Sequence, residues 1–339
     1  MHDLSLSGFW NSLRHRRPDE APRRYRRDDL MKTVEAVVDG TDSRIRLVRG
    51  YRNTLQSVIG AAQDYTDRLV AEIPGAIEVS RRTFLSDPYV NAFFVDVSDL
   101  QLIFSRSSEV RDFLENCGRE GVRECCALLC MQRSEKTVLG MKLSGDILRK
   151  EVPQRTVSFS DHRIYSPAPT EEETREGLRQ CLFNGLVTNA LERVTRLKLD
   201  SRQRRSRLRM LQSRLNHLEH RLRREKNDGL RREVEHTRQQ LERLRHDHAG
   251  TGEASPQDSL QQVVAVFGRP DEFVRLRKVS LRLNKMGICI EGDSGEPCNR
   301  LELTEAIIND SPPRVITLAR FPRDELLPRT AVSGPGLFS

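Results

Sequence analysis

Residues 208–222 carry a leucine at every third or fourth position, in the sequence LRMLQSRLNHLEHRL. This spacing is typical of the a and d positions of a left-handed coiled coil. The same register continues upstream and lapses only at Ser201 and Arg204, so ten of its twelve seam positions are apolar. The pattern predicts one long helix. Its upstream apolar positions are Phe183, Val187, Ala190, Val194 and Leu197.

Local signals set the limits of this helix. Thr170, followed three residues later by Glu173, has the form of a capping box, so we expect the helix to begin at Glu171. The segment Lys226-Asn227-Asp228-Gly229 can end it, because glycine readily takes the left-handed conformation that stops a helix. At 1.5 Å per residue the helix would be about 80 Å long.

A second apolar series follows the Asn-Asp-Gly segment, but it is out of phase with a continuous coil. Folding the chain back at this segment matches five layers in one register, which favours an antiparallel hairpin. A parallel dimer remains the alternative. The layers pair Leu222 with Leu230, Leu218 with Val234, Leu215 with Thr237, Leu211 with Leu241 and Leu208 with Leu244. On one flank the register places Arg221 beside Glu233, Arg207 beside Asp247 and Arg214 opposite Gln240.

The net charge of +8 is unevenly distributed along the 339 residues. Residues 193–232 hold 15 Lys or Arg against four Asp or Glu, and residues 1–27 hold seven against three. The chain therefore has a mildly acidic body with two basic segments. Its modest apolar content, 37% with only 5% aromatic residues, suits one or two small cores and argues against a single large enzyme-like core.

The seven cysteines show no disulfide-framework spacing, and no apolar run reaches the length of a signal peptide or a membrane span. We therefore expect a cytoplasmic protein without a transmembrane segment. Cys125, Cys126 and Cys130 alternate with apolar residues and lack the paired Cys-x-x-Cys spacing of zinc sites. They are expected to be core residues, and no metal or cofactor is expected.

The rest of the chain predicts a mainly helical α+β protein. Helical signals precede residue 120: Asp42 can cap a helix that reaches Ile73, and Asp87-Pro88 can begin another. Strands are expected at 125–131, at 137–143 after a polar turn, at 156–159, and beyond the long helix at 279–283, 288–290, 301–308 and 315–318. The segments flanking the arm can form one small antiparallel β body, or two separate small domains.

The expected organisation follows from these signals. It comprises a basic N-terminal segment (1–27), a helical region (28–120), a first β segment (121–169), a coiled-coil arm (170–248), a linker (249–258), a helix with a second β segment (259–322) and a tail (323–339).

Two short motifs invite a catalytic interpretation. Gly292-Asp293-Ser294-Gly295-Glu296-Pro297 resembles the nucleophile segment of trypsin-like serine proteases, Gly-Asp-Ser-Gly-Gly-Pro, but Glu296 replaces a glycine. The resemblance would put a nucleophile at Ser294, yet the partner segments of that family are missing, so a hairpin loop is expected instead. Ser160-Asp161-His162 lists triad residue types, but neighbours on a strand point apart. No catalytic residue is assigned, and whether the chain is an enzyme stays open, with the balance against it.

Three functions remain, none named by a motif. We expect an interaction or scaffold protein that binds a protein partner, or itself, through the arm; its layout resembles that of uncharacterised bacterial coiled-coil proteins. The Arg-rich arm could instead bind nucleic acid, and the N-terminal segment could hold the protein at a membrane surface. The candidate nucleic-acid contacts are Arg202, Arg204, Arg205, Arg207, Arg209 and Arg214. The candidate membrane or docking residues are Phe9, Trp10, Leu13, Arg14, Arg16 and Arg17.

Overall fold

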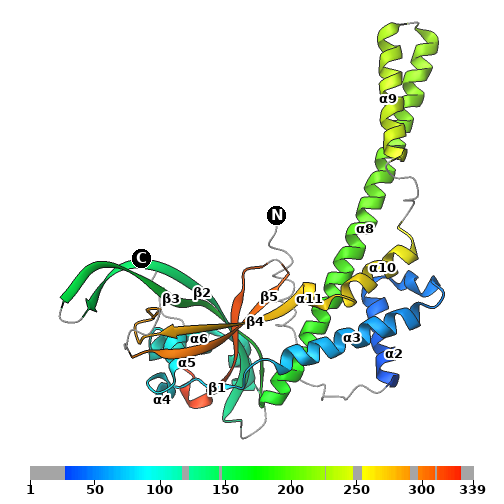
Figure 1. Cartoon of the computed structure of the whole chain (residues 1–339). Helices are drawn as coiled ribbons and strands as arrows, with labels where there is room; N and C mark the ends of the chain where they lie inside the picture. The colour runs from blue at the N-terminus through cyan, green and yellow to red at the C-terminus, as the bar shows by residue number, and fades with distance from the viewer. Residues whose placement is uncertain are drawn as a thin grey trace. The chain divides into compact units, whose positions relative to one another are not determined.

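The computed structural model describes residues 27–116, 122–144, 147–225, 227–246, 254–290, 297–309 and 311–329 (Figure 1). It confirms a mixed fold with one long helix, α8 (Glu171–Arg224), and an antiparallel sheet. The chain divides into two compact units. Among the described residues, unit 1 comprises Gln63–Gly185 and the residues from Pro270 on, and unit 2 comprises the residues up to Ala62 and Leu186–Arg269. Helices α3 (Tyr51–Ala71) and α8 each contribute to both.

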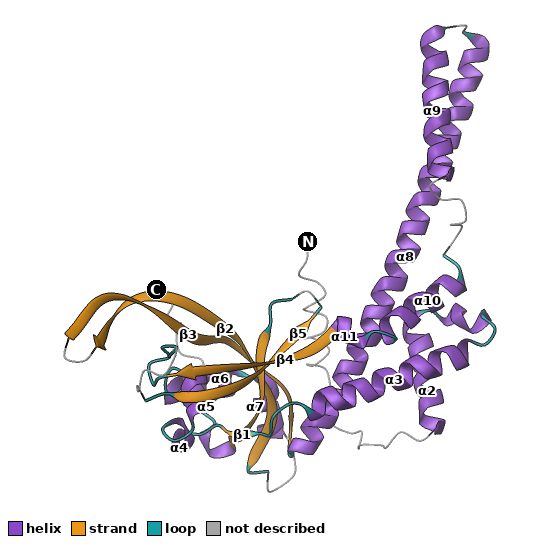
Figure 2. Ribbon diagram, in the orientation of Figure 1, coloured by secondary structure: helices purple, strands orange, loops and turns teal. Residues whose placement is uncertain are grey.

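Unit 1 is built on a sheet with the strand order β3-β2-β6-β5-β4 (Figure 2). The short β1 adds to β6 in parallel, and the other pairings are antiparallel. Because β2 and β3 precede α8 whereas β4 to β6 follow it, segments on both sides of the long helix share one sheet. The strands are β1 (Ile77–Glu78), β2 (Glu124–Ser144), β3 (Ile147–Ala168), β4 (Val274–Leu283), β5 (Asn299–Ile308) and β6 (Arg314–Pro322).

The segment after β4 joins the two outer strands of this sheet. The carbonyl of Gly287 accepts the N–H of Val157 on β3 at 2.8 Å, and the N–H of Ile290 donates to Arg282 on β4 at 2.8 Å. Gly287 has a φ of 72°, and a Cβ there would lie 2.8 Å from the Val157 carbonyl, so only glycine fits this turn. The strand expected at 288–290 is thus a pair of isolated bridges.

One face of the sheet packs against short helices. Alternate residues of β2, from Cys125 to Met131, are fully buried against Phe93 and Phe104, as expected for a strand with one face on a core. As predicted, Asp87 caps α5, with Pro88 in its first turn. The short helices are α4 (Arg81–Phe84), α5 (Pro88–Phe93), α6 (Val97–Arg106) and α7 (Ser108–Asn116), with α11 (Pro270–Phe273) and η2 (Arg323–Glu325) later in the chain.

The opposite face of the sheet is covered by the end of α3 and the beginning of α8. Leu69 and Leu178 from these helices lie over Leu128 and Ile316 of the sheet. The guanidinium of Arg175 on α8 donates to the carbonyls of residues 70 and 73 at 2.6 and 2.9 Å, which ties α8 to the end of α3.

Unit 2 is helical. Its core contains residues without exposed surface from each main helix, among them Val34, Ile59, Ala190, Val194 and Val263. Its elements are α2 (Arg27–Thr41), η1 (Ser43–Leu47), the first part of α3, most of α8, α9 (Asp228–His246) and α10 (Pro256–Phe267).

Two local expectations were wrong. Asp42 caps the short 3-10 helix η1 and not a continuous helix to Ile73, because Gly50, with a φ of 78°, interrupts the chain before α3. The polar residues 132–136 are no turn: they continue β2 and pair with 156–160 of β3. The partner strand supplies the buried residues Val157 and Phe159, whereas residues 132–136 are exposed or half-buried and so tolerate polar side chains.

Candidate interaction surface on helices α8 and α9

Helix α8 begins where its capping signal places it. The Thr170 hydroxyl accepts the N–H of Glu173 at 3.2 Å, and α8 starts at Glu171 as predicted. The helix ends at Arg224. Beyond it, the Asn227 side chain accepts the N–H of Gly229 at 2.7 Å, an Asx turn that leads directly into α9.

The expected seam residues of α8 and α9 lie in one apolar cluster. Six of them are buried and three are partly buried, and Thr237 is 1% exposed among them. The Thr237 hydroxyl donates to the carbonyl of Glu233 at 2.8 Å, which satisfies its polar group inside the cluster. The buried members are Leu211, Leu215, Leu218, Leu230, Val234 and Leu241, and the partly buried ones are Leu208, Leu222 and Leu244.

The charges along the cluster pair differently from expectation. Arg214 forms an ion pair with Glu233 at 2.8 Å and does not face Gln240, and Arg238 pairs with Glu219 at 2.8 Å. Arg221 lies instead 3.7 Å from the carboxylate of Glu225, the residue that follows α8. The expectation compared only the nearest residues across the layers, whereas a long arginine side chain reaches about one turn further to an opposite charge. Asp247, the expected partner of Arg207, lies outside the described residues.

The lapse in the seam has a structural cause. The Ser201 side chain is 5% exposed, and its hydroxyl accepts the N–H of Ala254 at 3.1 Å, just before α10. At this level α8 therefore contacts the returning chain. A polar seam residue fits there because it satisfies a buried backbone N–H.

A buried carboxylate joins three elements just below this level. The Asp42 side chain is 4% exposed and lies 2.9 Å from the ammonium of Lys198 on α8. It also accepts the Ser259 hydroxyl of α10 at 2.7 Å and the Arg44 guanidinium at 3.1 Å. Burial raises the pKa of the Asp42 carboxyl, but these hydrogen bonds outweigh burial and hold its pKa well below the usual range.

The charge imbalance is concentrated on α8. Between Asp200 and Glu219 this helix has six arginines and no acidic residue, whereas α9 has five arginines and four acidic residues. Of the candidate nucleic-acid contacts, Arg202, Arg207, Arg209 and Arg214 are exposed, and Arg204 and Arg205 are half-buried. Within the described residues, no ion pair or hydrogen bond engages the side chains of Arg202 and Arg209.

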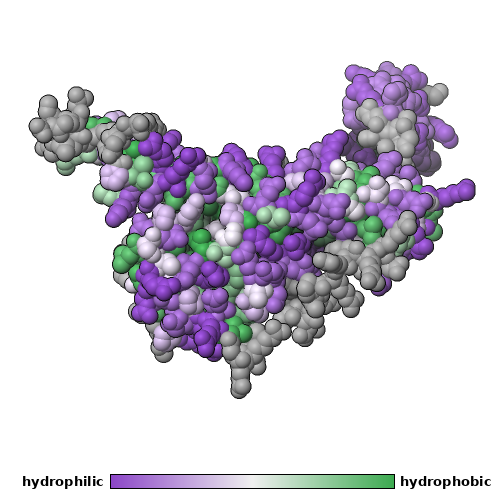
Figure 3. Space-filling model, turned by 60° about the horizontal axis from the view of Figure 1, so that its bottom comes forward, coloured by the Kyte–Doolittle hydropathy of each residue, from purple (hydrophilic) through white to green (hydrophobic). Residues whose placement is uncertain are grey.

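Two exposed apolar residues lie on the same side of α8 as these two arginines. Leu199 is 56% and Met210 63% exposed. At 100° per residue, Leu199, Arg202, Arg209 and Met210 share an arc of about 100° on the side of α8 opposite the seam. We call these four residues the outer face. Elsewhere the visible part of α8 and α9, at the upper right of Figure 3, is mainly hydrophilic.

Asp161 and His162, two described residues of the triad-like motif, do not contact each other through their side chains. Asp161 lies in a bulge with a φ of 48° and pairs with Arg163 and Arg314. His162 points elsewhere: its Nε2 lies 2.8 Å from the carbonyl of Phe93 and its ring stacks on Phe94. Ser294 lies outside the described residues, as do all the candidate membrane or docking residues, Phe9, Trp10, Leu13, Arg14, Arg16 and Arg17.

The cysteines near the start of β2 are buried in unit 1. Burial raises the pKa of both the Cys125 and Cys130 thiols to about 12, so they are not nucleophiles at neutral pH. In the part of the chain that the structure describes, no three His, Cys, Asp or Glu side chains gather in a group that could hold a metal ion.

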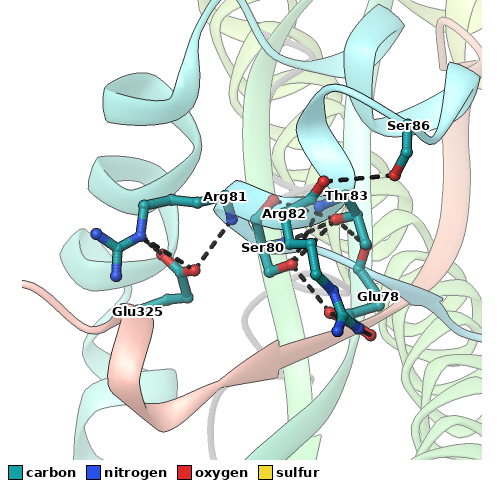
Figure 4. A network of polar contacts seen from close by, with 7 residues as sticks. All are labelled: Glu78, Ser80, Arg81, Arg82, Thr83, Ser86 and Glu325. Carbon is teal, nitrogen blue, oxygen red and sulfur yellow. Dashed lines mark hydrogen bonds and ion pairs between the residues drawn. The ribbon is translucent and has the colours of Figure 1, made fainter.

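Sequence reasoning missed a polar network around α4 (Figure 4). Ser80 and Thr83 form a reciprocal capping box, and the Ser80 hydroxyl donates to Glu78 at 2.9 Å. Glu325, 6% exposed, accepts the N–H of Arg81 at 3.0 Å and an ion pair from its guanidinium. Every group in this network has a structural partner, so the network anchors η2 to α4. In the sequence, only the spacing of Ser80 and Thr83 indicates this network.

Sequence reasoning also missed the ribbon formed by the outer parts of β2 and β3. Beyond residue 131, β2 pairs only with β3, and Val138, Leu139 and Met141 are 41%, 70% and 63% exposed there. The strand expected at 137–143 is present, but the sequence does not indicate that the rest of the sheet ends before it.

Comparisons with known proteins add no identity: no family model, no curated protein and no solved structure matches the chain. Across the described ranges, no helix has both the length and the apolar content needed to cross a membrane.

Proposed function

We propose that the protein is an interaction or scaffold protein whose α8–α9 arm is an antiparallel coiled-coil hairpin, and that the outer face of this arm binds an acidic surface of a protein partner. The observation that carries the proposal is the difference in exposure between the two sides of α8: the seam side is buried and the outer face is exposed. The seam leucines are buried in a cluster within one chain. The arm therefore needs no second copy to cover its seam, and its outer face stays available.

The composition of the outer face favours a protein partner. Transfer of an exposed apolar side chain from water into an apolar pocket of a partner is favourable. A phosphate backbone offers no such pocket. Leu199 and Met210 lie 11 residues apart, or about 16 Å along the helix, with Arg202 and Arg209 beside them. A partner surface with carboxylates around an apolar depression matches this arrangement.

Nucleic acid is the second candidate because the acid-free run of α8 is a specific electrostatic feature. Its arginines could neutralise phosphates without reading bases. The basic segment 193–232 contains no Tyr, Phe or Trp, so stacking on single strands is not part of this alternative. A membrane adaptor role remains a proposal about the N-terminal residues alone.

Two variants of the full-length protein separate these functions. Arg202→Glu with Arg209→Glu reverses the charge of the outer face, and Arg232→Glu with Arg243→Glu makes the same change on exposed positions of α9 as a control. Partners recovered from the host after cross-linking should be lost with the first pair and kept with the second.

A third variant, Met210→Ser, leaves the charge unchanged. It should weaken protein capture but not affect nucleic-acid retention. Loss of bound RNA or DNA in the Arg202 and Arg209 variant, with a salt slope reduced by about 0.9 per lost phosphate contact on duplex DNA, would move the assignment to nucleic acid. Capture that all three variants leave intact would remove the outer face from both functions.

A further inference from the structure

Unit 1 contains an apolar hollow of about 40 Å³ between its sheet and the covering helices. Leu69 and Leu178 form part of its roof, and Leu128, Ala306 and Ile316 form part of its floor. Every lining residue is apolar. A water molecule is not stabilised in such a space, since a buried water molecule needs two to four polar partners.

Polar contacts hold the roof of the hollow at a fixed distance from its floor. The Tyr65 hydroxyl of α3 donates to the carbonyl of Val274 on β4 at 2.7 Å. The Thr174 hydroxyl of α8 donates to the carbonyl of Cys126 on β2 at 2.9 Å. Apolar packing would favour closing an empty space, because its lining loses dispersion contacts. The fixed length of these contacts opposes that collapse, so the hollow is a built feature of unit 1.

The strand register places positive charge at the border of the hollow. Ala306 pairs with Arg314 across β5 and β6, and Ile316 pairs with Cys130, which in turn pairs with Arg163 on β3. Neighbouring strands lie about 5 Å apart, so Arg314 directly adjoins the floor. The side chains of Arg163 and Arg314 share one acid, Asp161, and are 40% and 19% exposed. The group therefore carries a net charge of +1.

We propose that this hollow is a binding site for a short-chain alkyl carboxylate, with the alkyl chain between sheet and helices and the carboxylate on Arg314 and Arg163. A guanidinium has five N–H donors, so both arginines can bind a carboxylate while keeping Asp161. The alkyl chain replaces the dispersion contacts that the empty hollow lacks. The site lies in unit 1 and is independent of the arm.

The proposal predicts a dependence on chain length. Each buried methylene contributes about 0.8 kcal/mol, a factor of about four in affinity. Affinity should therefore rise about fourfold for each carbon that enters the hollow and level off once the chain fills this small space. The alcohol 1-pentanol should bind more weakly than pentanoate because it lacks the charged head group.

Methyl-labelled NMR of the full-length protein tests the site with sodium pentanoate as the probe. The expected result is a saturable shift of the methyl signals of Leu128, Leu178 and Ile316. Arg314→Gln should weaken pentanoate binding at least tenfold and leave 1-pentanol binding unchanged. Arg300→Gln, at a 74% exposed position on β5, is the matched control and should bind as the unmodified protein does.

A filling variant tests the hollow itself. Ala306→Leu should occupy the space and abolish binding of both probes while leaving the methyl spectrum folded. If that variant fails to fold, Arg314→Gln alone decides the role of the charge. Absence of saturable shifts in the lining methyls, or equal loss of binding in Arg314→Gln and Arg300→Gln, would overturn the proposal.

Discussion

Asp42 allows the sharpest stability test, because one buried carboxylate holds η1, α8 and α10 together. In Asp42→Asn the side chain keeps its size and one acceptor oxygen but loses its charge. Ser259, which has no exposed surface, can keep a neutral hydrogen bond. Lys198 and Arg44 are 28% and 41% exposed, so water can partly replace their lost partner.

The expected loss of stability in Asp42→Asn follows from these three hydrogen-bond partners. A hydrogen bond to a charged group contributes about 1.5–3 kcal/mol, and partial rehydration of the two cations reduces the sum. We expect Asp42→Asn to lower the local stability of unit 2 by about 2 kcal/mol. That value corresponds to roughly thirtyfold faster hydrogen exchange. Asp39→Asn is the matched control: its carboxylate pairs with Arg46 at 2.8 Å but is 63% exposed, so its effect on exchange should be far smaller than that of Asp42→Asn.

The direction of the Asp42 pKa shift predicts how the stability of unit 2 depends on pH. The folded pKa of Asp42 lies below its unfolded value, so its contribution is complete above the unfolded value of about 3.9 and is lost as pH falls through the folded pKa. Exchange measured by mass spectrometry on peptides of α2 and α10 should show a constant difference from Asp42→Asn near neutral pH and a shrinking one below about pH 4. A difference no larger than that of Asp39→Asn, or one that persists unchanged in acid, would refute this role.

Three further predictions concern the seam, the thiols and the serine motif. Leu218→Ala should cost about 2–4 kcal/mol and speed exchange in α9, whereas Leu199→Ala on the outer face should cost less than about 0.5 kcal/mol; equal effects would contradict the buried cluster. Native Cys125 and Cys130, with pKa values raised to about 12 by burial, should resist iodoacetamide at neutral pH and react only after unfolding, as read by mass spectrometry. Ser294→Ala should change stability by less than about 0.5 kcal/mol, and a fluorophosphonate label that depends on Ser294 would instead reveal a nucleophile.

The parts of the fold that were predictable rest on local signals. The start of α8 follows from Thr170 and Glu173, and the seam positions follow from a period that repeats over many residues. The strand order β3-β2-β6-β5-β4 was not predictable, because pairing between segments more than a hundred residues apart leaves no local trace. The continuation of β2 through residues 132–136 was missed because the polar composition of this segment is typical of a turn, and only its pairing with β3 makes it extended.

Among the candidate sites too, those that rest on a local pattern were predictable and those that rest on distant contacts were not. Periodicity alone identified the residues around Leu215, whereas the outer face required knowing which side of α8 the second helix leaves open. Asp42 was recognised only as a cap, because its contact with Lys198 spans more than 150 residues. The hollow in unit 1 depends on contacts among four strands and two helices, and its apolar residues look like ordinary core residues in the sequence.

We propose that the arm is a hairpin within one chain, with its outer face free. Cysteines introduced at Leu211 and Leu241, which the register places in one layer, test it most directly. Oxidation of the full-length double variant should give a disulfide within a single chain, seen as a monomer with altered mobility on a non-reducing gel and as one linked peptide pair by mass spectrometry. Exclusively intermolecular disulfides, at protein concentrations where the unmodified chain is monomeric, would show that the seam joins two copies and would contradict the account.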